Sequence, residues 1–258
     1  MDTSRSIERV GGFCCSVLVA LYVIAGVTFL LLPVKASVLD PVGFANAYTT
    51  HRFVYRVFFL SFGFIAVFTF GAIPAISALV RSESEGLIRW SSNLAYLGSG
   101  VLALNSFRTV GLIDMRTEIF LSLDAEGQKI LAAAPLVMDQ HAYLTFGATG
   151  FYFLTVGILL FKSEGGLLAS VGVMLGVVFE LVVIGWAAAS MPLLSGLATV
   201  GGVLIGPVWF FLLGQRLRAS AKPVDVKPPA KPTHAHSHKI KSSKRRRPSA
   251  EDDLLDEI

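Results

Sequence analysis

The residue of this chain whose position most suggests chemistry is Glu180, an acid well inside the apolar stretch Leu167–Trp186. A helix of about 20 apolar residues crosses the hydrocarbon core of a bilayer, and an ionisable side chain inside such a helix is a default candidate for function. A carboxylate in hydrocarbon is costly unless it is paired or protonated. Arg108 and Arg56, on other apolar segments, are the candidate partners of Glu180, and His141 is the third.

Polar residues of four predicted helices fall at a similar depth on one side of the membrane when the helices are threaded in alternating directions. This predicted polar pocket consists of Glu180, Arg108, Asn105, Arg56, Asp139 and His141. Two interpretations are open. The cluster is either a structural network that fixes helix register, or a pocket facing outward. Such a pocket would take a small anion, a lipid head group or a quinone-like molecule, or would carry a proton-coupled step.

The elements that must position these residues are long apolar segments. Hydrophobic residues make up 53% of the 258 residues, charged residues 16%, and the mean hydropathy is +0.65. This composition belongs to the membrane class. We therefore expect an all-α polytopic membrane helix bundle in residues 11–215. Its six transmembrane helices are predicted at about residues 11–33, 53–80, 90–113, 141–161, 166–188 and 194–213.

Three other segments need separate interpretation. The first apolar segment is about 20 residues long, longer than the apolar part of most signal peptides, so a retained helix is favoured over a cleaved leader. Lys35–Arg52 is expected to be a loop, with Asp40-Pro41 as a turn signal. Residues 114–140 should contain a short helix that starts near Ser122–Glu126, either on the membrane surface or folded back as a lid over the polar cluster.

Small residues suggest how the last two helices pack. Gly172 and Gly176 are four residues apart on the fifth helix, as are Gly202 and Gly206 on the sixth. Helices in lipid need such positions for close approach. We expect the fifth and sixth helices to be antiparallel neighbours and these glycines to serve close helix packing. The adjacent Cys14 and Cys15 are expected to be small core residues without a disulfide.

The distribution of basic residues indicates an orientation. With both termini in the cytoplasm, including the short N-terminal segment 1–10, sixteen Lys and Arg residues lie inside and six outside. This imbalance favours cytoplasmic termini. Eleven of the sixteen belong to residues 216–258, and without them the count decides nothing.

Residues 216–258 form a tail of different character, with five prolines and no aromatic residue, and are expected to be disordered. The basic run would hold anionic lipid head groups, which is favoured over nucleic acid beside a membrane. The acidic end would dock on a cytosolic or membrane protein partner through one apolar face. The residues assigned to these contacts are Lys244, Arg245, Arg246, Arg247, Leu254, Leu255 and Ile258.

The closing motif Gly206-Pro207-Val208-Trp209, with Gly214-Gln215-Arg216-Leu217, resembles uncharacterised six-helix bacterial membrane proteins grouped as domains of unknown function. The resemblance covers Gly11–Arg218. It implies a helix bundle in a bacterial inner (plasma) membrane and no particular activity.

Two functions are compatible with these features. The first is a non-enzymatic anchor that recruits a cytosolic partner through its tail. The alternative is a small-molecule or proton-coupled transporter, or a ligand sensor, built around Glu180. No nucleophile–base pair and no set of metal ligands occurs at a suitable spacing, so we expect no enzyme activity, no cofactor and no metal. Homo-oligomerisation is left open.

Overall fold

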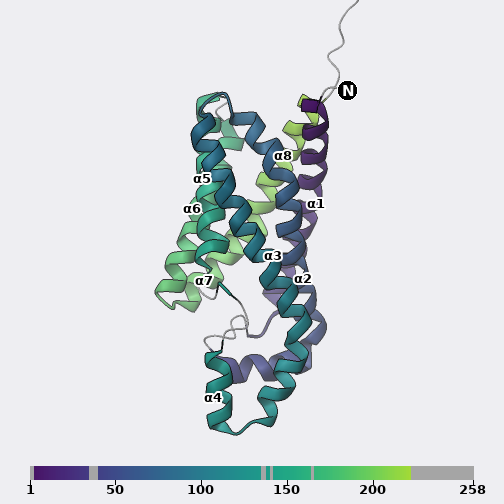
Figure 1. Cartoon of the computed structure of the whole chain (residues 1–258), viewed down its shortest axis with the longest axis vertical. Coiled ribbons are helices and arrows are strands. Elements are labelled where there is room, and N and C mark those ends of the chain that lie inside the picture. The colour runs from purple at the N-terminus through teal and green to yellow at the C-terminus, as the bar shows by residue number, and fades with distance from the viewer. Residues whose placement is uncertain (1–2, 35–39, 135–137, 140–141, 164–165, 222–258) are drawn as a thin grey trace, which may run out of the picture. The chain divides into compact units, whose positions relative to one another are not determined.

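The computed structural model describes residues 3–34, 40–134, 138–139, 142–163 and 166–221, and these form helices joined by turns (Figure 1). Two of the helices are π-helical segments, η1 and η2. The elements are α1 Thr3–Leu31, α2 Pro41–Val80, α3 Glu85–Ser122, α4 Ala125–Ala133, η1 Tyr143–Ala148, α5 Thr149–Ser163, α6 Gly166–Ala187, α7 Met191–Ala198, η2 Thr199–Ile205 and α8 Gly206–Ser220.

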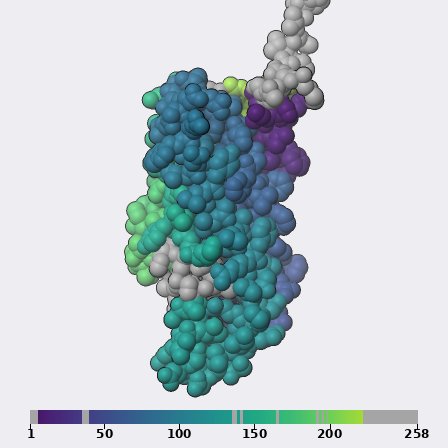
Figure 2. Space-filling model, in the orientation of Figure 1, coloured from purple at the N-terminus to yellow at the C-terminus, as the bar shows by residue number. Residues whose placement is uncertain are grey.

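Five stretches of the described residues are long and apolar enough to cross a membrane. They are Ser6–Leu31, Pro41–Val80, Tyr143–Ser163, Gly166–Ala187 and Thr199–Ser220. Each contains most of one predicted span, so the chain has the helices of a multi-pass membrane protein. The predicted third span, residues 90–113, lies within α3, which packs along α2 and α5 but is more polar than the other long helices. Figure 2 shows α3 and the end of α2 forming much of the visible face.

The loop predicted for Lys35–Arg52 is wrong from Pro41 onward, where the chain is already helical. Asp40 caps this helix, because its side chain accepts a hydrogen bond of 2.8 Å from the Gly43 amide, and Pro41 occupies the first helical turn. Asp-Pro is therefore a helix start here rather than a turn. Inside α2 the backbone departs from helical angles at His51, where φ is −120° and ψ is 34°.

Helices α2 and α3 are longer than a bilayer requires. With 40 and 38 residues they contain about 60 Å and 57 Å of helix, that of α2 divided by the kink at His51, against the ~30 Å of a hydrocarbon core. Their surplus turns lie at the same end, where α2 begins and α3 ends, and α4 lies beside them (Figure 1). A small separate core made of Leu32, Phe44, Tyr48, Tyr55 and Ile113 holds this end together.

The short helix predicted near Ser122–Glu126 is confirmed as α4. Asp124 caps it by accepting a 2.9 Å hydrogen bond from the Gly127 amide. Arg116 of α3 donates to the carbonyl oxygens of Leu131 and Ala134 at the end of α4. These bonds attach α4 to α3, so its position is set by hydrogen bonds, and none of its side chains is buried.

The closest backbone packing of α6 is made with α5. A side-chain carbon at Gly176 would lie 2.5 Å from the Leu154 amide nitrogen, and one at Gly157 would lie 2.5 Å from that of Val173. A side-chain carbon at Gly172 would lie 2.8 Å from Nε1 of Trp209 on α8, so the predicted close packing at the glycines of α6 is found against α5 and α8. Gly202 has no neighbour within 4 Å of such a carbon, and Gly206 faces Tyr22 of α1.

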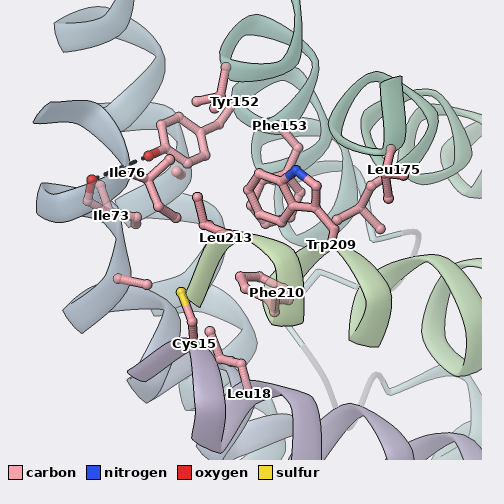
Figure 3. Close-up of a cluster of buried hydrophobic side chains, with 14 of the residues drawn as sticks. Cys15, Leu18, Ile73, Ile76, Tyr152, Phe153, Leu175, Trp209, Phe210 and Leu213 are labelled. Carbon is pink, nitrogen blue, oxygen red and sulfur yellow. Dashed lines mark hydrogen bonds between the residues drawn. The ribbon is translucent and has the colours of Figure 1, made fainter. Parts of the chain in front are cut away.

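The main core lies where α1, α5, α6 and α8 meet α2. Trp209, Phe153 and Phe210 pack edge to face at its centre, as Figure 3 shows. Cys14 and Cys15 are buried free thiols in this region, as expected. Tyr152 donates to the carbonyl oxygen of Ile73 over 3.3 Å, which joins α5 to α2 through a polar contact inside the core.

The start of α1 and the end of α8 lie side by side. Arg218 donates to the Ser16 hydroxyl and, over 3.5 Å, to the Gly12 carbonyl oxygen. A side-chain carbon at Gly11 would lie 3.3 Å from Leu217. These two helices are therefore antiparallel, and the described chain begins and ends at the same end of the bundle.

The α5–α6 contact generates the first testable prediction. Gly157→Ala should lower the thermal unfolding midpoint in detergent, because its new methyl group meets backbone atoms that cannot move aside, and overpacking of this kind costs about 1–3 kcal/mol. Gly111→Ala on α3 is the matched control, since nothing lies within 4 Å of its new methyl group. Equal midpoints for the two variants would contradict the close approach of α5 and α6.

Candidate functional site

A cavity of about 360 Å³ lies between the helices. Its walls come from α1, α2, α3 and α6, with contributions from both π-helical segments, from α7 and from the end of α4. The volume is within the range of about 300–1,000 Å³ that is usual for small-molecule sites, which also tend to lie between helices of a bundle.

One face of α3 forms a continuous wall of this cavity. The lining positions recur every three or four residues for six turns, which is the repeat of a single helix face. From Ser99 to Phe120 they extend about 32 Å along the helix. The cavity is therefore elongated. This α3 wall consists of Ser99, Leu102, Asn105, Ser106, Thr109, Ile113, Arg116, Thr117 and Phe120.

Most of the α3 wall is polar, and its hydroxyls are unpartnered. Thr109 is 1% exposed, and its Oγ1 has no hydrogen-bond partner among the described residues. The same holds for five other buried hydroxyls on the cavity wall, although their oxygen atoms are less enclosed. These five belong to Ser99, Ser106, Thr117, Thr145 and Thr149.

Hydroxyls elsewhere on the long helices behave differently. Ser61 and Ser92 each donate to the carbonyl oxygen one turn earlier, at 2.7 Å and 2.6 Å. Such bonds satisfy a buried hydroxyl locally. Among the described serine and threonine hydroxyls on the cavity wall, only that of Thr69 on α2 makes such a bond. The other six keep unused hydrogen-bonding capacity inside a protein interior, where an unsatisfied polar group costs about 1–3 kcal/mol.

Asn105 and Asp139 border the cavity and hold the chain segment that follows α4. The Asn105 side-chain oxygen accepts a 2.9 Å hydrogen bond from the Met138 amide. The Asp139 carboxylate accepts a 2.7 Å bond from the Thr145 amide at the start of η1. The amide nitrogen of Asn105 donates to none of the described residues. It therefore adds a donor to the polar wall.

The opposite walls are apolar and largely aromatic. Phe58, Phe59 and Phe62 of α2 line one side, and Phe179 and Trp186 of α6 line another. The cavity therefore offers hydrogen bonds along one length and aromatic surface along the others.

Both π-helical segments touch the cavity, η1 through Thr145 and Phe146 and η2 through Gly201 and Gly202. Segments of this kind are rare and are often found at functional sites. Gly98 of α3 makes room for η1 and the start of α5, since a side-chain carbon there would lie 2.6 Å from the Thr149 hydroxyl oxygen.

The structure separates the residues of the predicted polar pocket. Asn105 and Asp139 line the cavity, whereas Glu180, Arg108 and Arg56 do not. Arg56 forms an ion pair with Asp114 rather than with Glu180. His141 lies outside the described residues, as do the tail residues Lys244–Arg247, Leu254, Leu255 and Ile258.

Sequence reasoning missed the cavity hydroxyls, although α3 carried a signal. Ser99, Ser106, Thr109 and Thr117 occur at intervals of seven, three and eight residues. These intervals place small polar residues on one face of a helix that was assigned to the membrane. An apolar helix with one hydroxyl-bearing face needs that face covered by protein.

Asp114 organises a second polar cluster where α2 begins and α3 ends. The buried Tyr48 hydroxyl donates to its Oδ1 over 2.6 Å, and Arg56 contacts its Oδ2. The Tyr48 hydrogen bond and, after it, the Arg56 guanidinium hold the pKa of Asp114 below its usual value. The carboxylate is about one-third exposed, so this pair connects two helices at a partly hydrated surface.

Comparison of the chain with protein-family models, with curated proteins and with solved structures gives no match. The resemblance to uncharacterised six-helix bacterial proteins therefore stays a prediction. No three His, Cys, Asp or Glu side chains converge in the described part of the chain. The cavity therefore offers hydrogen-bond donors on one wall and aromatic side chains on the others.

A pH-dependent prediction follows from Asp114. Because its pKa is lower in the folded protein, the carboxylate stabilises the fold at pH values above its ordinary pKa, and this contribution is lost as the pH falls through the folded value. Asp114→Asn should lower the unfolding midpoint at pH 7 by a few degrees at most, since the pair is exposed. The variant should also lose less stability than wild type on acidification below about pH 4.

Glu118→Gln, an exposed change on the same helix, is the control. Identical acid profiles for wild type and Asp114→Asn would contradict this role.

Proposed function

We propose that this chain is a six-span membrane protein that binds an elongated, largely apolar small molecule in the cavity beside α3, as a transporter or a ligand sensor. The observation that carries the proposal is the row of buried cavity hydroxyls without partners, Thr109 above all. A folded protein seldom leaves buried polar atoms unpaired unless a ligand or ordered water satisfies them.

The lining suggests the chemistry of the ligand. The α3 wall supplies donors from hydroxyls, from the Asn105 amide and from the Arg116 guanidinium, so acceptor oxygens on the ligand suit it. The phenylalanine side of the cavity favours a hydrocarbon or ring surface. A column of water would satisfy the hydroxyls but would leave the aromatic walls in contact with water. A molecule with a few acceptor oxygens along an apolar body satisfies both walls.

The way the ends of the bundle meet supports six crossings. Because α1 begins beside the end of α8, an even number of crossings is proposed to connect them. Five segments are apolar enough to span by themselves, and α3, packed along α2 and α5, supplies the sixth. A polar cavity wall explains why its hydropathy is lower, since that face meets protein rather than lipid. The basic residues favour cytoplasmic termini, as in a bacterial inner membrane.

The anchor hypothesis remains a proposal of its own. It depends on a basic run that would hold anionic lipids and on an acidic end that would recruit a protein partner. Both lie in residues 222–258, outside the part of the chain that the structure describes. The cavity supports ligand binding whether or not the tail recruits a partner.

The topology can be tested with single cysteines in a background that lacks Cys14 and Cys15. A membrane-impermeant maleimide should label Glu83→Cys, in the α2–α3 turn, and Ser243→Cys, in the tail, from the same side of the membrane. It should label Lys129→Cys, on α4, from the other side. Labelling of Glu83→Cys and Lys129→Cys from one side would show that α3 does not cross.

The cavity can be tested by mass spectrometry of small molecules that copurify in mild detergent. Wild type should retain a bound molecule, and Ser106→Phe, which fills the cavity, should lower its amount at least about tenfold, the equivalent of about 1.4 kcal/mol. Leu104→Phe, on the exposed face of the same helix, should leave the amount unchanged.

A second variant separates ligand binding from folding. Thr109→Val keeps the shape of the side chain and removes the unpaired hydroxyl, so it should weaken binding while leaving the empty protein equally or more stable. A wild type that carries only water, or a Ser106→Phe protein with its ligand intact, would overturn the proposed function.

A further inference from the structure

Glu180 lies on a different face of α6 from the cavity. The cavity is lined by Val178, Phe179, Val182 and Trp186, and Glu180 is not among its residues. Val177 and Ile184, about one turn before and after Glu180 on its own face, are 42% and 56% exposed on the outer surface of the bundle. In a membrane that surface faces lipid, so Glu180 stands at the edge between lipid and the α5–α6 contact.

Two glycines make room for the Glu180 carboxyl group. A side-chain carbon at Gly150 of α5 would lie 3.1 Å from its Oε1, and one at Gly147 of η1 would lie 4.0 Å from its Oε2. The carboxyl group therefore packs over bare backbone, on the same α5–α6 seam where Gly157 and Gly176 bring the helices together. A side chain at Gly150 would crowd it, whereas a methyl group at Gly147 would make only an ordinary contact.

No counter-charge reaches this carboxyl group from the described residues. The elements packed against α6 are α5, η1, α7, η2 and α8. Their ionisable side chains are Tyr143, Tyr152, Lys162, Arg216 and Arg218. The Tyr152 hydroxyl is hydrogen-bonded to Ile73 and Ser77 of α2. The three cations are near the ends of α5 and α8 where the bundle begins, and Lys162 is 12 residues, or about 18 Å, from Gly150. Tyr143 is half exposed and lies one turn before Gly147.

We propose that Glu180 is a proton-binding carboxyl group presented to the lipid at the α5–α6 seam, a site separate from the cavity. An unpaired carboxylate in hydrocarbon is far less stable than the neutral acid. The group therefore holds its proton while the seam is closed. It releases the proton only when water or a cation reaches it, which requires α5 and α6 to move apart there. Proton binding at Glu180 is thereby coupled to the state of this helix contact.

A hydrophobic carbodiimide tests this site, because it reaches carboxyl groups from the lipid and reacts with the neutral acid. The acid proton moves to a carbodiimide nitrogen while a carboxyl oxygen bonds to the central carbon. The resulting O-acylisourea then rearranges to a stable N-acylurea, so the whole reagent adds and nothing leaves. Full-length protein in its membrane should gain one adduct at Glu180 at pH 7, where a carboxyl group in water, with a pKa of about 4.3, is almost fully ionised.

The controls separate a lipid-facing proton site from a merely structural residue. Glu180→Gln should lose the adduct and keep its thermal stability and its cavity ligand, whereas Glu118→Gln should keep the adduct. A water-soluble carbodiimide should not label Glu180, and labelling by the hydrophobic reagent should fall as the pH rises. Absence of the adduct in folded wild type, or equal labelling of Glu180→Gln, would overturn the proposal. Because the adduct is measured independently of any cavity ligand, this failure is distinct from failure of the proposed function.

Discussion

The bundle depends on one constraint: a helix that crosses lipid with hydroxyls and an amide on one face must have that face covered by protein. Helix α3 has such a face from Ser99 to Thr117. Helix α2 runs along one side of it, and η1 and α5 pack on another, with Gly98 allowing the closest approach. The covering helices present mainly phenylalanines, which cannot satisfy the hydroxyls. Coverage therefore removes the polar face from lipid without completing its hydrogen bonds, and a cavity rather than a packed core lies beside it.

The sequence predicted the long helices because hydropathy reports directly on lipid exposure. It failed at two places for physical reasons. Asp40-Pro41 occurs at both turns and helix starts, and only the bond from the Gly43 amide decides between them. Similarly, position along a span gives the depth of a residue but not the direction it faces. Arg56 was one of the candidate partners of Glu180 because their depths were similar. Asp114, on the adjacent face of α3, forms the ion pair with Arg56 instead.

The same ambiguity of direction explains why the cavity was not predicted. Asn105 and Asp139 were identified as polar outliers, and both do line it. The hydroxyls that matter most were overlooked, because serine and threonine usually satisfy themselves inside a helix by bonding to the preceding turn. Thr69 follows that rule. Thr109 does not, and only the three-dimensional structure shows which of the two hydroxyls is left without a partner. The seven-residue spacing from Ser99 to Ser106 indicates that the two residues share one face of the helix. It does not indicate that this face borders a cavity.

Helix α6 connects the two sites, since it has Phe179 and Val182 on the cavity and Glu180 on the lipid side. Adjacent residues of a helix point about 100° apart, so a small rotation of α6 changes both surfaces together. The glycine contacts with α5 resist such a rotation while the seam is closed. A ligand that pushes on Phe179 would strain the seam where the carboxyl group is held. Because such coupling acts in both directions, loss of the proton from Glu180 would change the affinity of the cavity for its ligand. The proposed proton site and the proposed ligand site are thus linked through one helix, without a direct contact between them.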